Sequence, residues 1–175
     1  MTTLIALFVA VGILAGVATW FYLAVGSILV WAGFVAWACF FHSGGDEAAL
    51  KSTIISNAFG VFCAWIAAIV ILAVPLAPVL SLPLWAGIVV AVTVGAYILA
   101  AHIEVLSSIP GTTYGYACTF AFLTQTPDKL SLDAMLSVSF SNALIVVIIS
   151  MIIGALFGYA SGKLAGVLTK AEAAA

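Results

Sequence analysis

Long apolar runs dominate the sequence, and polar or helix-breaking residues interrupt them at only a few places. From residue 4 to residue 41 the only ionisable side chains are Tyr22 and Cys39. A membrane-crossing helix needs about 20 apolar residues, so this run is too long for one crossing and must fold back, with Gly26 and Ser27 as the natural break. The pattern predicts six apolar helical segments, at residues 4–25, 27–41, 52–74, 84–106, 108–124 and 134–161.

Helix-start residues precede two of the later segments. Asp46 and Glu47 precede the third segment, where acidic side chains suit the positive end of the helix dipole. Thr126 and Pro127 precede the sixth, with a capping hydroxyl and a proline suited to the first helical position. The second and fifth segments span only about 23–26 Å at 1.5 Å per residue, which is less than the ~30 Å thickness of the hydrocarbon core. Residues 162–175 are predicted to form a short tail.

The composition is that of a membrane protein. Of the 175 residues, 66% are hydrophobic and only 6% are charged, which is too few charges to cover a soluble domain of this size. The N-terminus lacks the basic start and the cleavage pattern of a removable signal peptide, so we expect the first segment to be retained. The net charge of −2 implies no affinity for nucleic acid. We therefore expect a single all-α transmembrane domain over residues 1–175.

Several short motifs occur twice. Trp-Ala-Cys-Phe-Phe at 37–41 recurs as Tyr-Ala-Cys-Thr-Phe at 116–120, which is 79 positions later, and the same offset places Gly16 on Gly95. Ser-Asn-Ala at 56–58 recurs at 141–143 with an offset of 85. We interpret these matches as two repeats, at about residues 4–74 and 84–161. Because each repeat holds three crossings, the second must enter the bilayer inverted, as in many transporters.

The four lysines predict the orientation. With both termini in the cytoplasm, Lys51, Lys163 and Lys170 lie inside and only Lys129 lies outside. Cytoplasmic loops carry an excess of positive charge, so we expect both termini to be cytoplasmic. The proline-rich linker at 75–83 is then an uncharged strap on the outer face, between the two repeats.

The two short segments are the strongest candidates for a solute path. Short or Gly/Pro-interrupted segments at matching places in two halves mark many transport sites, and threonine and tyrosine hydroxyls offer hydrogen bonds to a polar solute. The alternative is that the glycines serve helix packing and the aromatic residues mark membrane interfaces. The candidates in these segments are Gly33, Phe34, Trp37, Gly111, Thr112, Thr113 and Tyr116.

Asn57 and Asn142 are the clearest polar pair in the predicted spans. An amide inside the bilayer must find a partner or face water. One interpretation places both amides along the path, where they donate to a carbonyl-bearing or aqueous solute. In the other, each amide bridges neighbouring helices, worth about 0.6–2 kcal/mol. The sequence leaves both interpretations open.

His102 and Glu104 are the only ionisable pair inside a predicted span. Side chains two positions apart on a helix do not face each other, so a direct acid–base couple is disfavoured. A proton- or cation-coupling role is the alternative to an interfacial position. Glycines at small-residue steps predict helix packing rather than chemistry: Gly12, Gly16, Gly95, Gly154, Gly158 and Gly162.

Catalytic and metal-binding motifs are absent from the sequence. It contains no GxSxG, HExxH or Walker motif. Its two histidines lie 60 residues apart. We therefore expect neither an enzyme nor a bound metal or other cofactor.

Trp-Ala-Gly-Phe at 31–34, Pro-Gly-Thr at 110–112 and Phe-Gly-Tyr-Ala at 157–160 occur in this order along the chain. In these motifs and their spacing the chain resembles the bacterial inner-membrane proteins of the YcdZ type, and the likeness covers nearly its whole length. The resemblance implies six helices and a location in the bacterial inner membrane. His102 and Glu104 lie outside the shared pattern.

Three functions are compatible with these patterns. The first is a passive channel or facilitator for a small neutral or weakly polar solute such as urea or an amide, because coupled transporters and ion channels usually keep charged groups inside and this chain has almost none. The second is a proton- or ion-coupled secondary transporter that uses His102 and Glu104. The third is a non-transporting scaffold that binds partner proteins. Six short helices form a thin wall in the bilayer, so we also expect a homo-oligomer, with the glycines of the sixth segment or the first segment at its contact.

Overall fold

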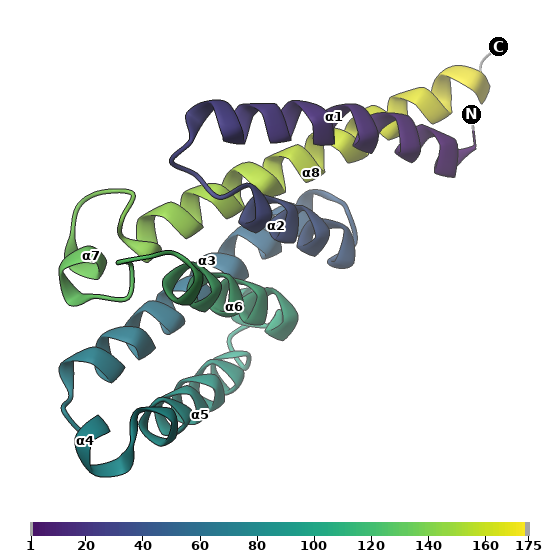
Figure 1. Ribbon diagram of the computed structural model, residues 1–175. Coiled ribbons are helices and arrows are strands. Elements are labelled where there is room, and N and C mark those ends of the chain that lie inside the picture. Colours follow the sequence, from purple (N-terminus) through teal and green to yellow (C-terminus); the bar gives the residue numbers. More distant parts are fainter. Residues whose placement is uncertain (1, 174–175) are drawn as a thin grey trace. The chain divides into compact units, whose positions relative to one another are not determined.

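The computed structural model describes residues 2–173, and for residues 170–173 it describes the backbone alone (Figure 1). The last two residues of the predicted tail and the side chain of Lys170 therefore lie outside the described part. Within it the chain forms only helices, as predicted, and no strand. The elements are α1 (Thr3–Val25), α2 (Val30–His42), α3 (Glu47–Ala73), α4 (Ala77–Leu80), α5 (Leu82–Ala100), the 3-10 helix η1 (Glu104–Leu106), α6 (Ile109–Gln125), α7 (Leu132–Leu136) and α8 (Ala143–Ala173).

Four of these helices are long and apolar enough to cross a membrane: α1, α3, α5 and α8. The helices α2 and α6 have 13 and 17 residues, or roughly 20 and 26 Å of length. They are the two short segments predicted from the sequence. The prediction of α6 is correct to within one residue at each end.

Local capping explains where two of the helices begin. Gly26 ends α1 with a φ of 69°, which a residue with a side chain rarely adopts, so α2 begins at Val30 and not at the predicted residue 27. Asp46 accepts a hydrogen bond from the backbone N–H of Ala49 at 2.7 Å and so caps α3. For this reason α3 begins at Glu47, five residues before the predicted start at 52.

The prediction of one helix over residues 134–161 is wrong at both ends. A separate short helix, α7, ends at Leu136, and α8 begins only at Ala143. The helix then continues to Ala173, through most of the predicted tail. The predicted strap at 75–83 also contains one helical turn, α4.

The chain folds into two compact units. The first unit contains the chain up to Ile54 together with the chain from Ser150 onward, and the second contains Ile55–Ile149. This division assigns the first two turns of α3 and most of α8 to the first unit. The second unit holds the rest of α3 together with α4, α5, α6 and α7.

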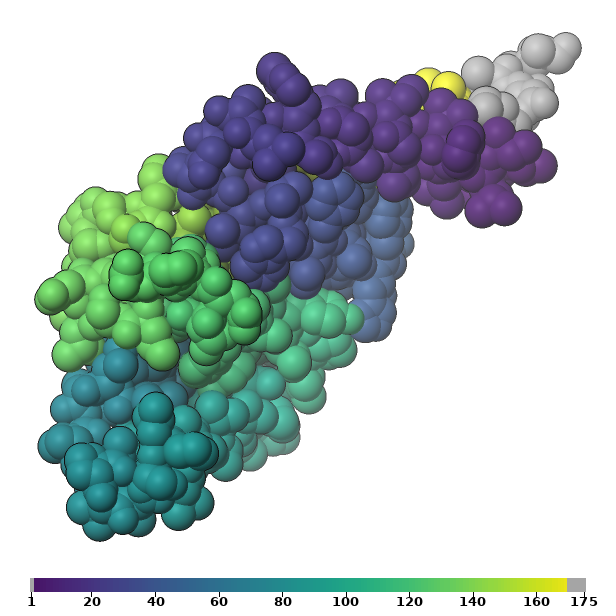
Figure 2. All heavy atoms as spheres, viewed as in Figure 1, coloured from purple at the N-terminus to yellow at the C-terminus, as the bar shows by residue number. Residues whose placement is uncertain are grey.

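In the first unit, α1 lies along the C-terminal part of α8 (Figure 1). Ala6 and Ala10 of α1 pack with Ala165 of α8 in a small apolar core. The surface of α1, purple in Figure 2, carries large exposed apolar side chains that include Phe8 at 77% and Trp20 at 70%. Such a surface suits contact with lipid rather than with water.

In the second unit, α5 packs against the C-terminal half of α3. Ala64 of α3 shares an apolar core with Trp85 and Val89 of α5 and with Tyr116 of α6. The indole N–H of Trp85 also donates a hydrogen bond to the carbonyl of Ile71 at 3.3 Å. This packing places α6 beside α3, where most of the candidate polar residues lie.

Candidate functional site

In the second unit, α6 approaches the backbone of α3 through glycines. A Cβ atom on Gly60 of α3 would meet the carbonyl oxygen of Thr112. A Cβ atom on Gly115 of α6 would meet the carbonyl oxygen of Asn57. The two backbones are therefore too close to admit a side chain at either glycine, as in the small-residue contacts of membrane helices.

Asn57 lies in this contact and is 1% exposed. Neither the oxygen nor the nitrogen of its side-chain amide has a hydrogen-bond partner among the described residues. A buried polar group without a partner costs about 1–3 kcal/mol. Asn57 follows Glu47 by ten residues, or about 15 Å along α3, which is half of the ~30 Å hydrocarbon thickness.

Two predicted path residues of α6 instead connect it to α5. The hydroxyl of Thr113 lies 3.1 Å from that of Tyr97, and the hydroxyl of Tyr116 lies 2.8 Å from that of Thr93. Thr113 is exposed, whereas Thr112 is buried. The hydroxyls of Thr113 and Tyr116 thus hold two helices together.

In the first unit, α2 meets α8 at an equally close contact. A Cβ atom on Gly154 of α8 would meet the backbone of Gly33 of α2. The hydroxyl of Tyr22 covers Gly33 and donates a hydrogen bond to the carbonyl of Ser150 at 2.6 Å. The hydroxyl of Ser150 accepts the backbone N–H of Leu29 at 2.8 Å, so it satisfies a donor that the start of α2 would leave unpaired.

Trp37 is fixed on both sides in this contact. Its indole N–H donates to the hydroxyl of Ser161 at 3.1 Å. Its ring stacks on Phe34 and on Phe157, with centroid distances of 5.6 and 6.0 Å, and covers Gly158. Trp37 is buried, whereas Phe34 is 38% exposed. Trp37 therefore has the surroundings of a packing residue.

Each close contact is built on a serine followed four positions later by a glycine. Ser56 and Gly60 of α3 receive α6, with the Ser56 hydroxyl directly at Gly111. Ser150 and Gly154 of α8 receive α2. Ser150 was not among the residues predicted from sequence, although this spacing recurs 94 positions apart and could have revealed it.

The prediction that Asn142 lies inside a membrane helix is wrong. Asn142 precedes α8, and its side-chain oxygen accepts the backbone N–H of Leu144 at 2.9 Å. Its amide nitrogen donates to the carbonyl of Ser137 at 3.0 Å. Both ends of this amide are therefore used locally at the start of a helix, where asparagine is favoured.

The prediction that His102 and Glu104 lie within a span is also wrong. The α5 helix ends at Ala100, and its last turn tightens because the N–H of Ala101 bonds to the carbonyls of Ile98 and Leu99. His102 and Glu104 follow in the connection to α6, where both side chains are exposed.

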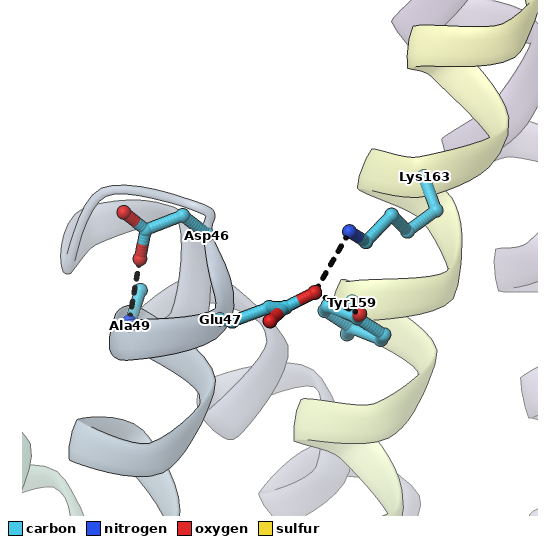
Figure 3. A network of polar contacts seen from close by, with 5 residues as sticks. All are labelled: Asp46, Glu47, Ala49, Tyr159 and Lys163. Carbon is cyan, nitrogen blue, oxygen red and sulfur yellow. Dashed lines mark hydrogen bonds and ion pairs between the residues drawn. The ribbon is translucent and has the colours of Figure 1, made fainter.

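A cluster of charged and polar side chains connects the start of α3 to α8 in the first unit (Figure 3). One carboxylate oxygen of Glu47 accepts hydrogen bonds from Lys163 at 3.1 Å and from the hydroxyl of Tyr159 at 3.0 Å. The Lys163 ammonium also lies 5.0 Å from the centre of the Tyr159 ring. The neighbouring Asp46 points away and caps α3. The Glu47 and Lys163 side chains are 76% and 60% exposed, so this ion pair is of the weak, solvent-screened kind.

The buried polar side chains of the described residues carry no charge: Thr53, Ser56, Asn57, Thr112, Thr119, Asn142, Ser150 and Ser161. In the same part of the chain, no three His, Cys, Asp or Glu side chains lie close enough together to hold a metal ion. The polar groups of the buried regions are therefore hydroxyls and amides, without a charged side chain.

An all-helical fold with four helices able to cross a membrane, packed through glycines and neutral hydrogen bonds, is that of a helical membrane protein with several spans. The chain belongs to the family described as Protein of unknown function (DUF1097), which it matches over residues 8–166. No significant match was found among the curated proteins or among the solved structures.

Proposed function

We propose that the protein is a membrane channel or facilitator for a small neutral or weakly polar solute of the urea or amide type, without an enzymatic step or a cofactor. The observation that carries this proposal is that the polar side chains buried in the described residues are all hydroxyls and amides. A neutral solute needs hydrogen bonds but no countercharge, whereas coupled and ionic pathways use buried ionisable groups. The exposed positions of His102 and Glu104 favour the passive function over the coupled one.

We further propose six membrane segments in two inverted repeats, with α2 and α6 as the short members. The burial pattern supports this architecture. The six buried residues of α2 each have a buried counterpart 79 positions later in α6: Ala32, Gly33, Ala36, Trp37, Cys39 and Phe40 against Gly111, Thr112, Gly115, Tyr116, Cys118 and Thr119. At the same offset, the three buried residues of α5 match buried residues of α1: Trp85, Val89 and Tyr97 against Ala6, Ala10 and Ala18.

The third helices of the repeats match at another offset. Eight buried residues of α3 have buried counterparts 94 positions later in α8: Ala49, Thr53, Ser56, Asn57, Gly60, Val61, Ala64 and Ala67 against Ala143, Val147, Ser150, Met151, Gly154, Ala155, Gly158 and Ser161. The change from 79 to 94 corresponds to an insertion between α6 and α8, where α7 lies. At this offset the counterpart of Asn57 is Met151, in place of the Asn142 expected from the tripeptide match.

Two contacts support opposite membrane directions for α3 and α8. Glu47 at the start of α3 bonds to Lys163 in the C-terminal part of α8. Trp65 in the C-terminal half of α3 donates its indole N–H to the carbonyl of Met135, which precedes α8, at 3.0 Å. Both contacts are expected if the start of one helix and the end of the other share a membrane face.

We place the protein in the bacterial inner membrane with both termini in the cytoplasm. The YcdZ-type motifs support the location. The contact between Glu47 and Lys163 groups Lys163 with Lys51 at one face, while Lys129 precedes α8 at the other. The positive-inside rule then assigns the face with more lysines to the cytoplasm.

We also propose a homo-oligomer whose contact includes α1. Gly154 and Gly158 of α8 are already covered by α2 within the chain. A Cβ atom on Gly12 or Gly16 of α1, in contrast, would meet nothing within 4 Å, and Gly95 of α5 is equally open. A small-xxx-small pair without an intrachain partner is suited to contact with a second copy in the bilayer.

Solute flux into liposomes tests the proposed function. We expect liposomes with the purified protein to take up urea and acetamide several times faster than empty liposomes, measured by stopped-flow light scattering. The rates should not change when a pH gradient is imposed, because the buried side chains of the described residues include no acid, lysine or histidine to carry a coupled proton. Rates equal to those of empty liposomes would exclude the facilitator, and uptake that needs the gradient would favour the coupled transporter.

A further inference from the structure

We infer that the Asn57 amide selects the solute, and that the selected class is the ureas and primary carboxamides, which carry a carbonyl oxygen beside an N–H group. The inference rests on the proposed function and assigns its specificity to one residue. Both ends of this amide lack a hydrogen-bond partner among the described residues. Its hydrogen-bonding capacity is therefore not used within the described part of the chain.

The chemistry of an amide determines which molecules match it. The asparagine oxygen accepts hydrogen bonds and the NH₂ group beside it donates them in the same plane. A urea or carboxamide presents the same two groups in the reverse order, so the two planar units can form a pair of parallel hydrogen bonds. A polyol such as glycerol has hydroxyls that rotate and no planar donor–acceptor pair. A carboxylic acid offers this pair only in its protonated form.

Packing does not explain an amide at this position. The contact between α3 and α6 is made by backbone atoms at Gly60 and Gly115, and the Asn57 side chain contributes no hydrogen bond to it. In α8 the matching position is Met151, which is also 1% exposed. An apolar side chain thus fills the equivalent place beside the other short helix. The polar group at Asn57 therefore has a role beyond filling space.

The other asparagine provides a matched control. Asn57 and Asn142 are the only asparagines in the sequence, and Asn142 uses both ends of its amide in local hydrogen bonds. Protein labelled with ¹⁵N-asparagine should give two side-chain amide signals, which an Asn142→Ala variant assigns. We expect urea or acetamide, added to the wild-type protein in detergent, to shift the Asn57 signal in a saturable way and to leave the Asn142 signal in place. Equal shifts of both signals, or no shift of the Asn57 signal, would overturn the inference.

Flux measurements separate this inference from the proposed function. In liposomes, Asn57→Leu should lower urea and acetamide flux about tenfold, the factor for 1.4 kcal/mol, and glycerol flux far less. Asn142→Ala should keep wild-type selectivity. Wild-type flux no faster than that of empty liposomes would overturn the proposed function. Flux that Asn57→Leu reduces equally for all solutes, or not at all, would overturn the selective role alone. If Asn57→Leu does not fold, the response of the Asn57 amide signal in the wild-type NMR spectrum tests the inference.

Discussion

At the scale of single residues, the glycines fall into two groups that the sequence does not distinguish. Gly60 and Gly115 lie directly against the backbone of a neighbouring helix, where a methyl group has no space. Gly87 and Gly95 of α5 face open space within the chain. The first group is required by packing, and the second lowers the helix propensity without improving any intrachain contact.

Alanine substitutions at Gly115 and Gly95 should therefore have opposite effects. Gly115→Ala should destabilise the protein by about 1–3 kcal/mol, the usual cost of overpacking, because its Cβ would meet the carbonyl of Asn57. Gly95→Ala should be neutral or should stabilise by up to about 1 kcal/mol. Chemical denaturation in detergent, followed by tryptophan fluorescence, measures both. Equal effects of the two substitutions would contradict the packing at α6.

Residue identity predicts chemistry only when the surroundings are also known. Asn57 was identified from the sequence as a polar residue within a span, and the structure leaves it inside α3. Asn142 belongs to the same tripeptide, yet it caps a helix. A three-residue match contains no information on whether its amide precedes a helix or lies within one. Only the surrounding backbone decides this.

At the scale of elements, hydrophobic length predicted α1 and α6 well and failed for α8. Residues 134–142 are partly apolar and continue into the hydrophobic run of α8. However, Ser137, Ser139 and Ser141 alternate there and bond to one another and to the local backbone. Such side-chain bonds compete with helix formation, so the chain forms a separate turn. Hydropathy alone does not detect this competition.

The exposed glycines of α1 lead to a prediction on assembly. Gly16→Leu places a large side chain on the face that we assign to the homo-oligomer, so it should shift the purified protein toward the monomer. Gly166→Leu is the matched control, because Gly166 is also open but lies in the C-terminal part of α8. Native mass spectrometry gives the number of copies. A wild-type monomer, or an unchanged oligomer in Gly16→Leu, would contradict a contact through α1.

At the scale of the whole molecule, the duplicated burial pattern supports the proposed repeats more strongly than the sequence motifs do. The sequence motifs suggested a pair of repeats from a few identical residues, whereas burial matches all six buried positions of α2 and eight positions of α3. Most of these positions differ in residue type between the repeats, as Asn57 and Met151 do. Sequence comparison cannot detect such positions, because the residue types differ while the burial matches.

Inverted repeats require the connections that precede α3 and α8 to lie on opposite membrane faces. In a variant without Cys39, Cys63 and Cys118, we expect Asp128→Cys to react with a membrane-impermeant maleimide in intact bacterial cells. Asp46→Cys should react only after permeabilisation. Both native aspartates are exposed, so access is not limited by burial. Labelling of both positions from the same side would contradict inverted repeats, and the reverse pattern would contradict cytoplasmic termini.

The division of the chain between the two units determines the order in which they can be completed during synthesis. The second unit is one continuous stretch, Ile55–Ile149, and all its residues leave the ribosome before Ser150. The first unit needs both ends of the chain. Gly154, which lies against Gly33, is synthesised 121 residues after it. Until then α2 lacks the helix that lies against Gly33. A stop codon in place of Ser150 would therefore leave α2 without this partner, while the second unit would still have all its residues.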